Sequence, residues 1–318
     1  MKLDVPPPEV AHAGLRALQT IAASDGVMHE LERGLLESVQ RLLLKTDLDV
    51  TQLGLIGPKE LAATVPPGIF RERILRGCTL MSLVDGDASP DEEGMLEDYA
   101  RALEVDPAPL KDFKRILHGK LGLLRIDVVR RSFIGKRVGQ HVDLKGVRGL
   151  AEVAITFRGG RVDALAKRYQ SLETYAEGTL GKGYYDFVRA NEFALPGEPY
   201  GAPEPIVFHD CVHVLAGYDT TPEEEVLAAA FQAGFQQYDP FFSLLFVICQ
   251  FHLGIQISPI AGTETMKMKP ATMLEAFVRG TQCTRDLSDG WDPWEHFGRS
   301  LAELREEYAI DERVPARG

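Results

Sequence analysis

An internal repeat of 60 residues constrains the fold of the first third of this 318-residue chain more than any other feature. Shifted by 60 positions, Asp25-Gly26 aligns with Asp85-Gly86, and Glu32 aligns with Glu92. The matches continue in the same register, with Gly34, Leu36, Glu37, Arg41 and Leu43 falling on Gly94, Leu96, Glu97, Arg101 and Leu103. A repeat of this length is typical of a duplicated supersecondary unit.

Each copy has the pattern of two helices joined by a turn. An apolar helical segment runs up to Asp-Gly, where glycine can adopt the left-handed conformation that ends a helix. In the second copy, Ser89, Pro90 and Glu92 provide the N-cap, the first-position proline and the capping-box acid of a new helix. Leucine and valine between residues 31 and 43 recur at helical spacing. We therefore predict an all-helical module over residues 1–118.

The charge distribution places a domain boundary near residue 119. Residues 119–149 carry eight basic and two acidic side chains, although the whole chain has a formal charge of −12. This basic block could neutralise two acidic neighbours. Because its lysines and arginines alternate with aliphatic residues, it could also contact an anionic membrane as a peripheral segment. We predict a second helical domain over residues 119–318, so that the fold is all-α with two helical domains.

The composition restricts the class of protein. Hydrophobic residues make up 45% and charged residues 26%, as in ordinary folded proteins. The acidic excess argues against nucleic acid as a partner. The four cysteines form no C-x-x-C pair, which argues against a disulfide framework or a cysteine zinc site. Since no signal peptide and no run of about 18 apolar residues occurs, we expect a cytoplasmic protein whose membrane contact, if made, is at the inner face.

The clearest chemical motif follows residue 205. Residues 206–216 are predicted to form a helix, on which His209 and His213 stand one turn apart on one face. This spacing is used when a helix offers two imidazoles to one metal. Eleven residues separate His213 from Glu225, which lies in the first turn of the next predicted helix. A tight turn would bring Glu225 to the imidazoles and leave the open coordination position of a catalytic metal site.

Asp210 lies about 100° around the helix from His209, outside the shared face. It either ligates through an irregular first turn or orients His209 from the outer sphere. We assign the metal site to His209, Asp210, His213 and Glu225, with zinc as the expected ion, and a proton-transfer role to Asp210 and Glu225. The alternative is a capped helix pair with two satisfied core histidines.

These residues resemble the Coq-four family of coenzyme Q (ubiquinone) biosynthesis. The family signature H-D-x-x-H, eleven residues, then E, is met by His209, Asp210, His213 and Glu225. The segments YAEGTLGKGYYDFVRANEF and WDPWEHFGRSLAELREEYAI also resemble the family, so that the likeness covers about residues 120–312. It implies an all-helical fold, a zinc-type divalent metal and a cavity for a prenyl chain. It further implies oxidative removal of the ring carboxyl from a prenylated quinone precursor, a lyase-type reaction.

The N-terminal module resembles the TerB-like family, which is named after a tellurite-resistance protein. The likeness rests on the paired D-G followed by a glutamate six residues on, and it covers about residues 10–118. It implies a compact helical module that is often fused to other domains, and it carries over no catalytic residue. Simple members of the Coq-four family lack such a module, so the fusion is a departure from their pattern.

An apolar segment later in the chain could bind a lipid. The run FFSLLFVICQFHLGI after Asp239-Pro240 is apolar on nearly all sides, and at about 15 residues it is too short to span a bilayer. We predict a buried helix that forms the core, lines an isoprenoid tunnel or packs a dimer. His252 near its end could reach the metal or lie at a polar boundary. We expect the closing helix to start at Asp292-Pro293.

Three functions are compatible with this pattern. The first is a metal-dependent enzyme, of decarboxylase type, that acts on a prenylated aromatic acid. The second is a non-catalytic lipid-binding scaffold that presents quinone intermediates to other biosynthetic enzymes. The third, an HD-type phosphohydrolase, needs a further upstream histidine, and none occurs between His141 and His209. The expected partners are a prenylated quinone precursor or another isoprenoid lipid, quinone-biosynthesis enzymes, and a second copy of the chain in a homo-oligomer.

Overall fold

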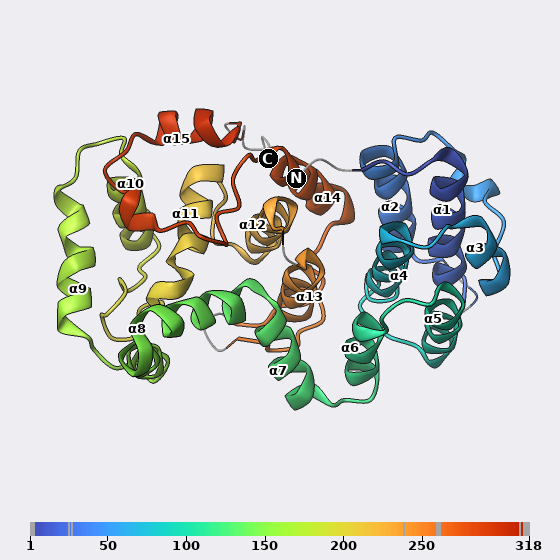
Figure 1. Cartoon of the computed structure of the whole chain (residues 1–318), viewed down its shortest axis with the longest axis horizontal. Helices are drawn as coiled ribbons and strands as arrows, with labels where there is room; N and C mark the ends of the chain where they lie inside the picture. Colours follow the sequence, from blue (N-terminus) through green and yellow to red (C-terminus); the bar gives the residue numbers. More distant parts are fainter. Residues whose placement is uncertain are drawn as a thin grey trace. The chain divides into compact units, whose positions relative to one another are not determined.

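A computed structural model describes residues 4–24, 26, 28–237, 239–258, 262–311 and 313. Within these residues the chain forms fifteen α-helices and no strand, which confirms the predicted all-helical fold (Figure 1). The chain divides into two compact units. We call residues 2–128 and 244–278 the repeat unit, and residues 129–243 and 279–318 the site unit.

The sequence did not predict which segments of the chain form each unit. Residues 244–278 belong to the repeat unit, although they follow the whole metal motif in the chain. The division falls inside three helices, α7 (Leu121–Arg131), α13 (Pro240–Phe251) and α14 (Pro270–Gln282). The domains 1–118 and 119–318 stay a prediction, and their terminal residues 1–3 and 314–318 lie outside the described residues.

In the repeat unit, two helix pairs follow the sequence repeat. The first pair is α1 (Pro8–Ala22) with α2 (Glu30–Ser38), and the second is α4 (Ile69–Met81) with α5 (Pro90–Leu103). Helix α1 lies against α4 (Figure 1). The unit is completed by α3 (Pro58–Thr64), α6 (Ala108–Leu117), the π-helical turn η1 (Val39–Leu44) and the 3₁₀ turn η2 (Val50–Gln52).

The aligned positions of the repeat have the same local structure. Glu32 and Glu92 both close capping boxes, at the starts of α2 and α5. Gly26 and Gly86 both have positive φ, 97° and 93°. Asp25, which the alignment pairs with Asp85, lies outside the described residues. The repeat therefore corresponds to a repeated turn followed by a capped helix.

The core of the repeat unit is formed by the apolar faces of these helices. Tyr99 is buried and its hydroxyl donates to the carbonyl oxygen of Ile56 at 2.7 Å. Burying a large apolar side chain contributes about 1.5–3 kcal/mol. The fully buried members include Leu15, Leu36, Leu61, Leu96 and Phe113.

Helix α13 is a core helix. Its apolar side chains are buried all around it, including Phe242, Leu245 and Ile248. His252 follows it and bonds backbone groups through both ring nitrogens, with Nε2 donating to Val84 O at 2.8 Å and Nδ1 accepting from Met268 N at 3.3 Å. His252 is therefore a structural residue. No helix in the described ranges is both long and apolar enough to cross a bilayer.

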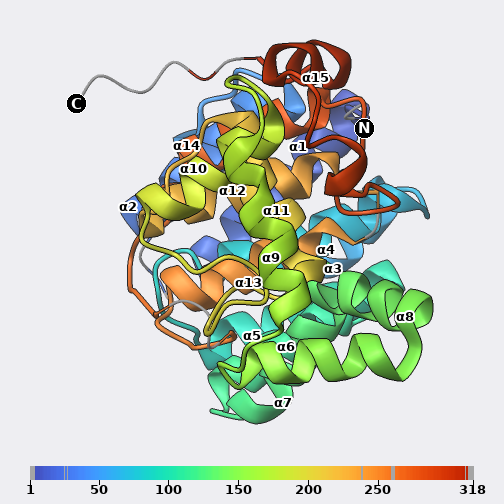
Figure 2. The ribbon, with the colours of Figure 1, turned by 90° about the vertical axis from the view of Figure 1, so that its left-hand side faces the viewer.

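In its described residues, the site unit contains six whole helices and three 3₁₀ turns, besides parts of α7, α13 and α14. Its longest helix, α8, bends at Gly146, where φ is 59° and ψ is −143°, so that its two halves run in different directions (Figure 2). The helices are α8 (Phe133–Phe157), α9 (Asp163–Gln170), α10 (Leu180–Ala190), α11 (Val207–Ala216), α12 (Pro222–Phe235) and α15 (Leu301–Tyr308), with the turns η3 (Ser171–Thr174), η4 (Glu204–Ile206) and η5 (Pro293–Glu295).

The closing helix begins later than the sequence indicates. Asp292 caps only the short turn η5, and α15 starts at Leu301. Between them, Phe297 O and Arg299 O accept the first N–H groups of α10, from Gly181 at 2.8 Å and Leu180 at 2.9 Å. The first N–H groups of a helix have no partner within it, and those of α10 find theirs in residues 297–299. Because the carbonyl oxygens of Phe297 and Arg299 bond α10 in this way, residues 297–299 do not continue into α15 as a helix. Glu312, the end of the Coq-four-like stretch, lies outside the described residues.

Candidate metal centre

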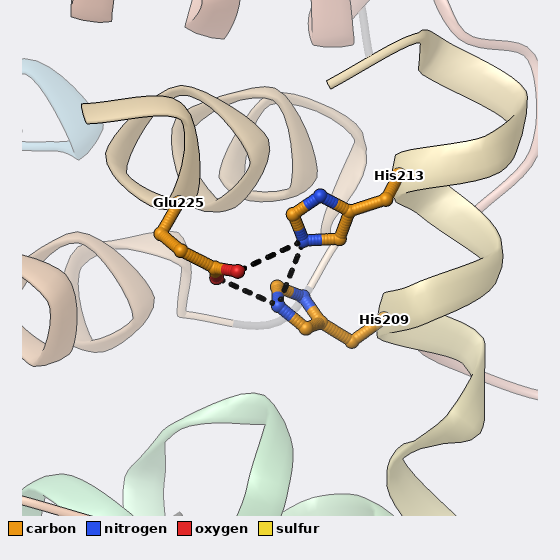
Figure 3. Close-up of side chains that lie close together, drawn as sticks. All are labelled: His209, His213 and Glu225. Carbon is orange, nitrogen blue, oxygen red and sulfur yellow. Dashed lines mark hydrogen bonds and ion pairs between the residues drawn. The ribbon is translucent and has the colours of Figure 1, made fainter. Parts of the chain in front are cut away.

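The helix–turn–helix predicted around the motif is present in the structure. Helix α11 ends at Gly217, whose N–H donates to His213 O at 2.8 Å. The side chain of Thr221 caps α12 by accepting the N–H of Glu224, and the N–H of Glu225 donates to Thr221 O at 2.8 Å. The turn places the first residues of α12 beside the histidine face of α11 (Figure 3).

His209, His213 and Glu225 converge on one point (Figure 3). His209 Nε2 lies 3.3 Å from Glu225 Oε2, and His213 Nε2 lies 3.5 Å from Glu225 Oε1. The two Nε2 atoms are 3.3 Å apart. The His213 side chain is buried, whereas 18% of the His209 side chain and 22% of the Glu225 side chain are exposed. The three residues form a group that could hold a metal ion.

The outer nitrogens of the imidazoles are held by carbonyl oxygens. His209 Nδ1 lies 3.0 Å from Gln232 Oε1, and His213 Nδ1 lies 3.3 Å from Tyr218 O. Since a carbonyl oxygen can only accept, each Nδ1 carries a hydrogen and each Nε2 faces Glu225, where it can bind a metal once it carries no proton. Two imidazole nitrogens and one carboxylate are the donor set of a catalytic zinc site, so these residues fit such an ion.

The charges of the group are strongly coupled. Burial disfavours a charged imidazole, but the hydrogen bond and the charge of Glu225 outweigh it and raise the pKa of His209 to about 9. Burial also disfavours the carboxylate, but the two histidines hold the pKa of Glu225 well below its usual range. A divalent cation could bind His209 Nε2 only after this nitrogen has lost its proton.

Asp210 is not part of the converging group. Burial raises the pKa of its carboxyl to about 6, and the nearby charges of His209 and His213 offset only part of that effect. Among the described residues, the Asp210 carboxylate accepts no hydrogen bond and forms no ion pair. Its assignment as a metal ligand and as a proton-transfer residue stays a prediction, as does the proton-transfer role of Glu225.

Sequence reasoning did not identify two residues of this site. Gln232 lies seven residues after Glu225, on the same face of α12, and a glutamine within an apolar stretch is a sign that could have been used. Phe187 of α10 stacks on His213 with ring centroids 5.4 Å apart. Its stacking partner could not be read from the sequence, because α10 and α11 are joined by a long connection.

A second group of residues that could hold a metal was also missed. It consists of His141, Glu152 and Glu204.

Comparisons of this chain with family models, with curated proteins and with solved structures gave no match. The two groups are therefore interpreted from their own geometry and chemistry.

Proposed function

We propose that this chain is a divalent-metal-dependent protein of quinone biosynthesis that acts on a prenylated aromatic acid, with zinc as its metal. The observation that carries the proposal is the convergence of His209, His213 and Glu225 with both Nε2 atoms turned inward. The substrate class comes from the resemblance of the H-D-x-x-H motif and its flanks to the Coq-four family. The proposed reaction is oxidative removal of the ring carboxyl with dioxygen as the oxidant: the carboxyl leaves as carbon dioxide, one oxygen atom takes its place on the ring, and the hydroxybenzoate becomes a quinone with release of water.

Each residue of the site has a distinct role in this proposal. His209, His213 and Glu225 hold the ion and leave one coordination position for a substrate oxygen. When bound, a divalent ion polarises the ring carboxylate or a neighbouring oxygen. Asp210 follows His209, and its carboxylate has no partner among the described residues, which suits it to move a proton. Glu225 is engaged by both histidines, which makes Asp210 the better candidate for this step.

The test is turnover of a prenylated hydroxybenzoate in air by the metal-loaded full chain. We expect release of carbon dioxide by the wild type and a loss of at least roughly a hundredfold in His213→Ala, since a ligand is removed. His12→Ala, which replaces an exposed histidine, serves as the control and should keep the wild-type activity. Lipid binding without turnover in the wild type would contradict the enzyme and leave the scaffold function.

We also propose that the basic block 119–149 contacts the anionic inner face of a membrane. Leu144 and Val147 flank the bend of α8 and are 87% and 85% exposed, an unusual state for aliphatic side chains. Arg148 is exposed beside them. Aliphatic residues next to cations are typical of segments that lie in the lipid headgroup region.

Vesicle sedimentation tests this contact. The wild type should bind vesicles that contain phosphatidylserine and should bind pure phosphatidylcholine vesicles much less. Leu144→Asp with Val147→Asp should abolish the difference, whereas Leu55→Asp, which alters an exposed leucine of the repeat unit, should leave it intact. Equal binding by the double variant and the wild type would refute the proposed contact.

A further inference from the structure

The second group of possible ligands lies at the bend of α8. His141 precedes the bend, Glu152 follows it, and Glu204 belongs to η4, five residues before His209. One ligand atom of each lies within 4.8 Å of the others. His141 Nε2 is 3.6 Å from Glu152 Oε2, beyond hydrogen-bond distance.

The bend is what brings these residues together. In a straight helix, residues 141 and 152 would lie about 16 Å apart along the axis. Gly146 instead has a positive φ that other residues rarely adopt. After the bend, Gly149 approaches His141 so closely that a Cβ atom there would lie 2.9 Å from His141 O. The conformation of α8 therefore places His141 and Glu152 at one site.

The position of Glu204 is fixed by contacts with α8 and α9. Arg137 of α8 donates to Pro205 O at 3.2 Å and so attaches η4 to the helix. On Glu204, Oε1 lies 3.5 Å from the Tyr169 hydroxyl and 3.4 Å from the Arg168 guanidinium. These contacts occupy one carboxylate oxygen and leave Oε2 turned toward the group.

Two observations indicate a place for a cation. His141 Nε2 is buried and has no hydrogen-bond partner in the described part of the chain, and only 10% of the His141 side chain is exposed. Buried nitrogens are rarely left in this state. The ammonium of Lys145 lies between the two carboxylates, 3.2 Å from Glu152 Oε2 and 2.5 Å from Glu204 Oε2.

Lys145 is able to leave this place. It adjoins Gly146 at the bend, and 35% of its side chain is exposed, so its ammonium can turn into water. Arg148 bonds Glu152 Oε1 at 3.0 Å and would hold this carboxylate in position after Lys145 moves. One imidazole nitrogen and two carboxylate oxygens then remain, a donor set that suits zinc or manganese.

We propose that His141, Glu152 and Glu204 form a second divalent-cation site, in which Lys145 is the internal cation that the metal replaces. This site is separate from the one on His209, His213 and Glu225, and it does not depend on the proposed enzymatic function.

Zinc stoichiometry tests the proposal. The full chain is dialysed against buffered micromolar zinc, and bound metal is measured by elemental analysis. We expect one more ion per chain in the wild type than in His141→Ala. His141→Gln, which keeps much of the side-chain volume, repeats the test if the alanine variant loses its thermal unfolding transition. His213→Ala reports on the first site alone, so failure of either site is recognised separately. Equal zinc content in the wild type and both His141 variants would overturn the proposal.

Lys145→Met gives the sharper test, because it removes the competing cation and leaves all three ligands. Affinity for zinc at this site should rise about tenfold or more, as the loss of one nearby positive charge predicts. Calorimetric titration in the His213→Ala background isolates the site. Lys167→Met, an exposed lysine of α9 without an ion pair in the described part of the chain, is the matched control. An unchanged affinity in Lys145→Met would refute the role of Lys145 and the site with it.

Discussion

Gln232 determines which nitrogen of His209 faces Glu225. Its side-chain carbonyl accepts the hydrogen of His209 Nδ1 at 3.0 Å, so that Nε2 is free to bind a metal. For His213 the same task falls to a backbone carbonyl, that of Tyr218, which no side-chain replacement removes. Gln232 is therefore the residue through which the orientation of the ligands can be tested.

We expect Gln232→Leu to weaken metal binding at the first site by about 10–100-fold, because His209 loses the acceptor that fixes its ring. Gln232→Glu keeps an acceptor oxygen and should bind at least as tightly as the wild type. Competition with a chromophoric zinc chelator measures both affinities. Wild-type affinity in the leucine variant would show that Gln232 does not orient His209.

Arg71 of α4 joins the ends of two other helices. Its guanidinium is buried and donates to three carbonyl oxygens, those of Ala62, Val65 and Leu103, each at 2.9 Å. Ala62 and Val65 lie at the end of α3, and Leu103 ends α5. Carbonyls at helix ends have no partner within the helix and carry its partial negative charge. One arginine thus holds two helix ends in the repeat unit.

Arg71→Met should lower the free energy of unfolding by about 3 kcal/mol, because it leaves buried carbonyls without donors. Urea unfolding measures the change. Arg101→Met is the control, since Arg101 is 73% exposed in its pair with Asp98 and should contribute less than about 1 kcal/mol. Similar losses in the two variants would contradict the role of Arg71 as a helix-end donor.

Local sequence patterns predicted the helix starts and ends that are determined by neighbouring residues in the chain. Ser89 and Pro90 start α5 as their capping pattern indicates, and the motif helix ends at Gly217. The bend of α8 was not predicted, because Gly146 looks like any other glycine in a helical stretch. The late start of α15 depends on bonds to α10 more than 100 residues earlier in the chain. Such contacts leave no local pattern.

At the scale of the whole molecule, the candidate metal site lies entirely in the site unit, and residues 244–278 lie in the repeat unit. The sequence identified α13 as buried but did not indicate that the boundary between the units crosses it. A helix that is apolar all around has no single face that indicates its neighbour. The convergence of His209, His213 and Glu225 was predictable because a four-residue spacing and a short turn determine it.

The site unit should lose stability in acid through Glu198. Arg189 donates two hydrogen bonds to this carboxylate, and Gln170 and the N–H of Leu195 donate two more. The Arg189 bonds are the main reason that the pKa of Glu198 falls to about 2, from 4.5 in the unfolded chain. The stabilisation is therefore complete above pH 4.5 and disappears as the pH falls toward 2.

We expect Glu198→Gln to lower the free energy of unfolding by about 2 kcal/mol at pH 7 and by almost nothing near pH 2. Urea unfolding of the wild type and the variant across this range gives the two profiles. Profiles that stay parallel down to pH 2 would show that Glu198 does not supply this pH dependence.

The decisive measurement for the candidate metal centre on α11 and α12 is the number of divalent ions that the purified full chain binds. It is compared with the number bound by His213→Ala and by Glu225→Gln. Each variant removes one ligand from the converging group and should hold one ion fewer than the wild type under the same free zinc concentration. Wild-type and variant chains that hold equal numbers of ions would show that His209, His213 and Glu225 form a structural ion pair and not a metal site.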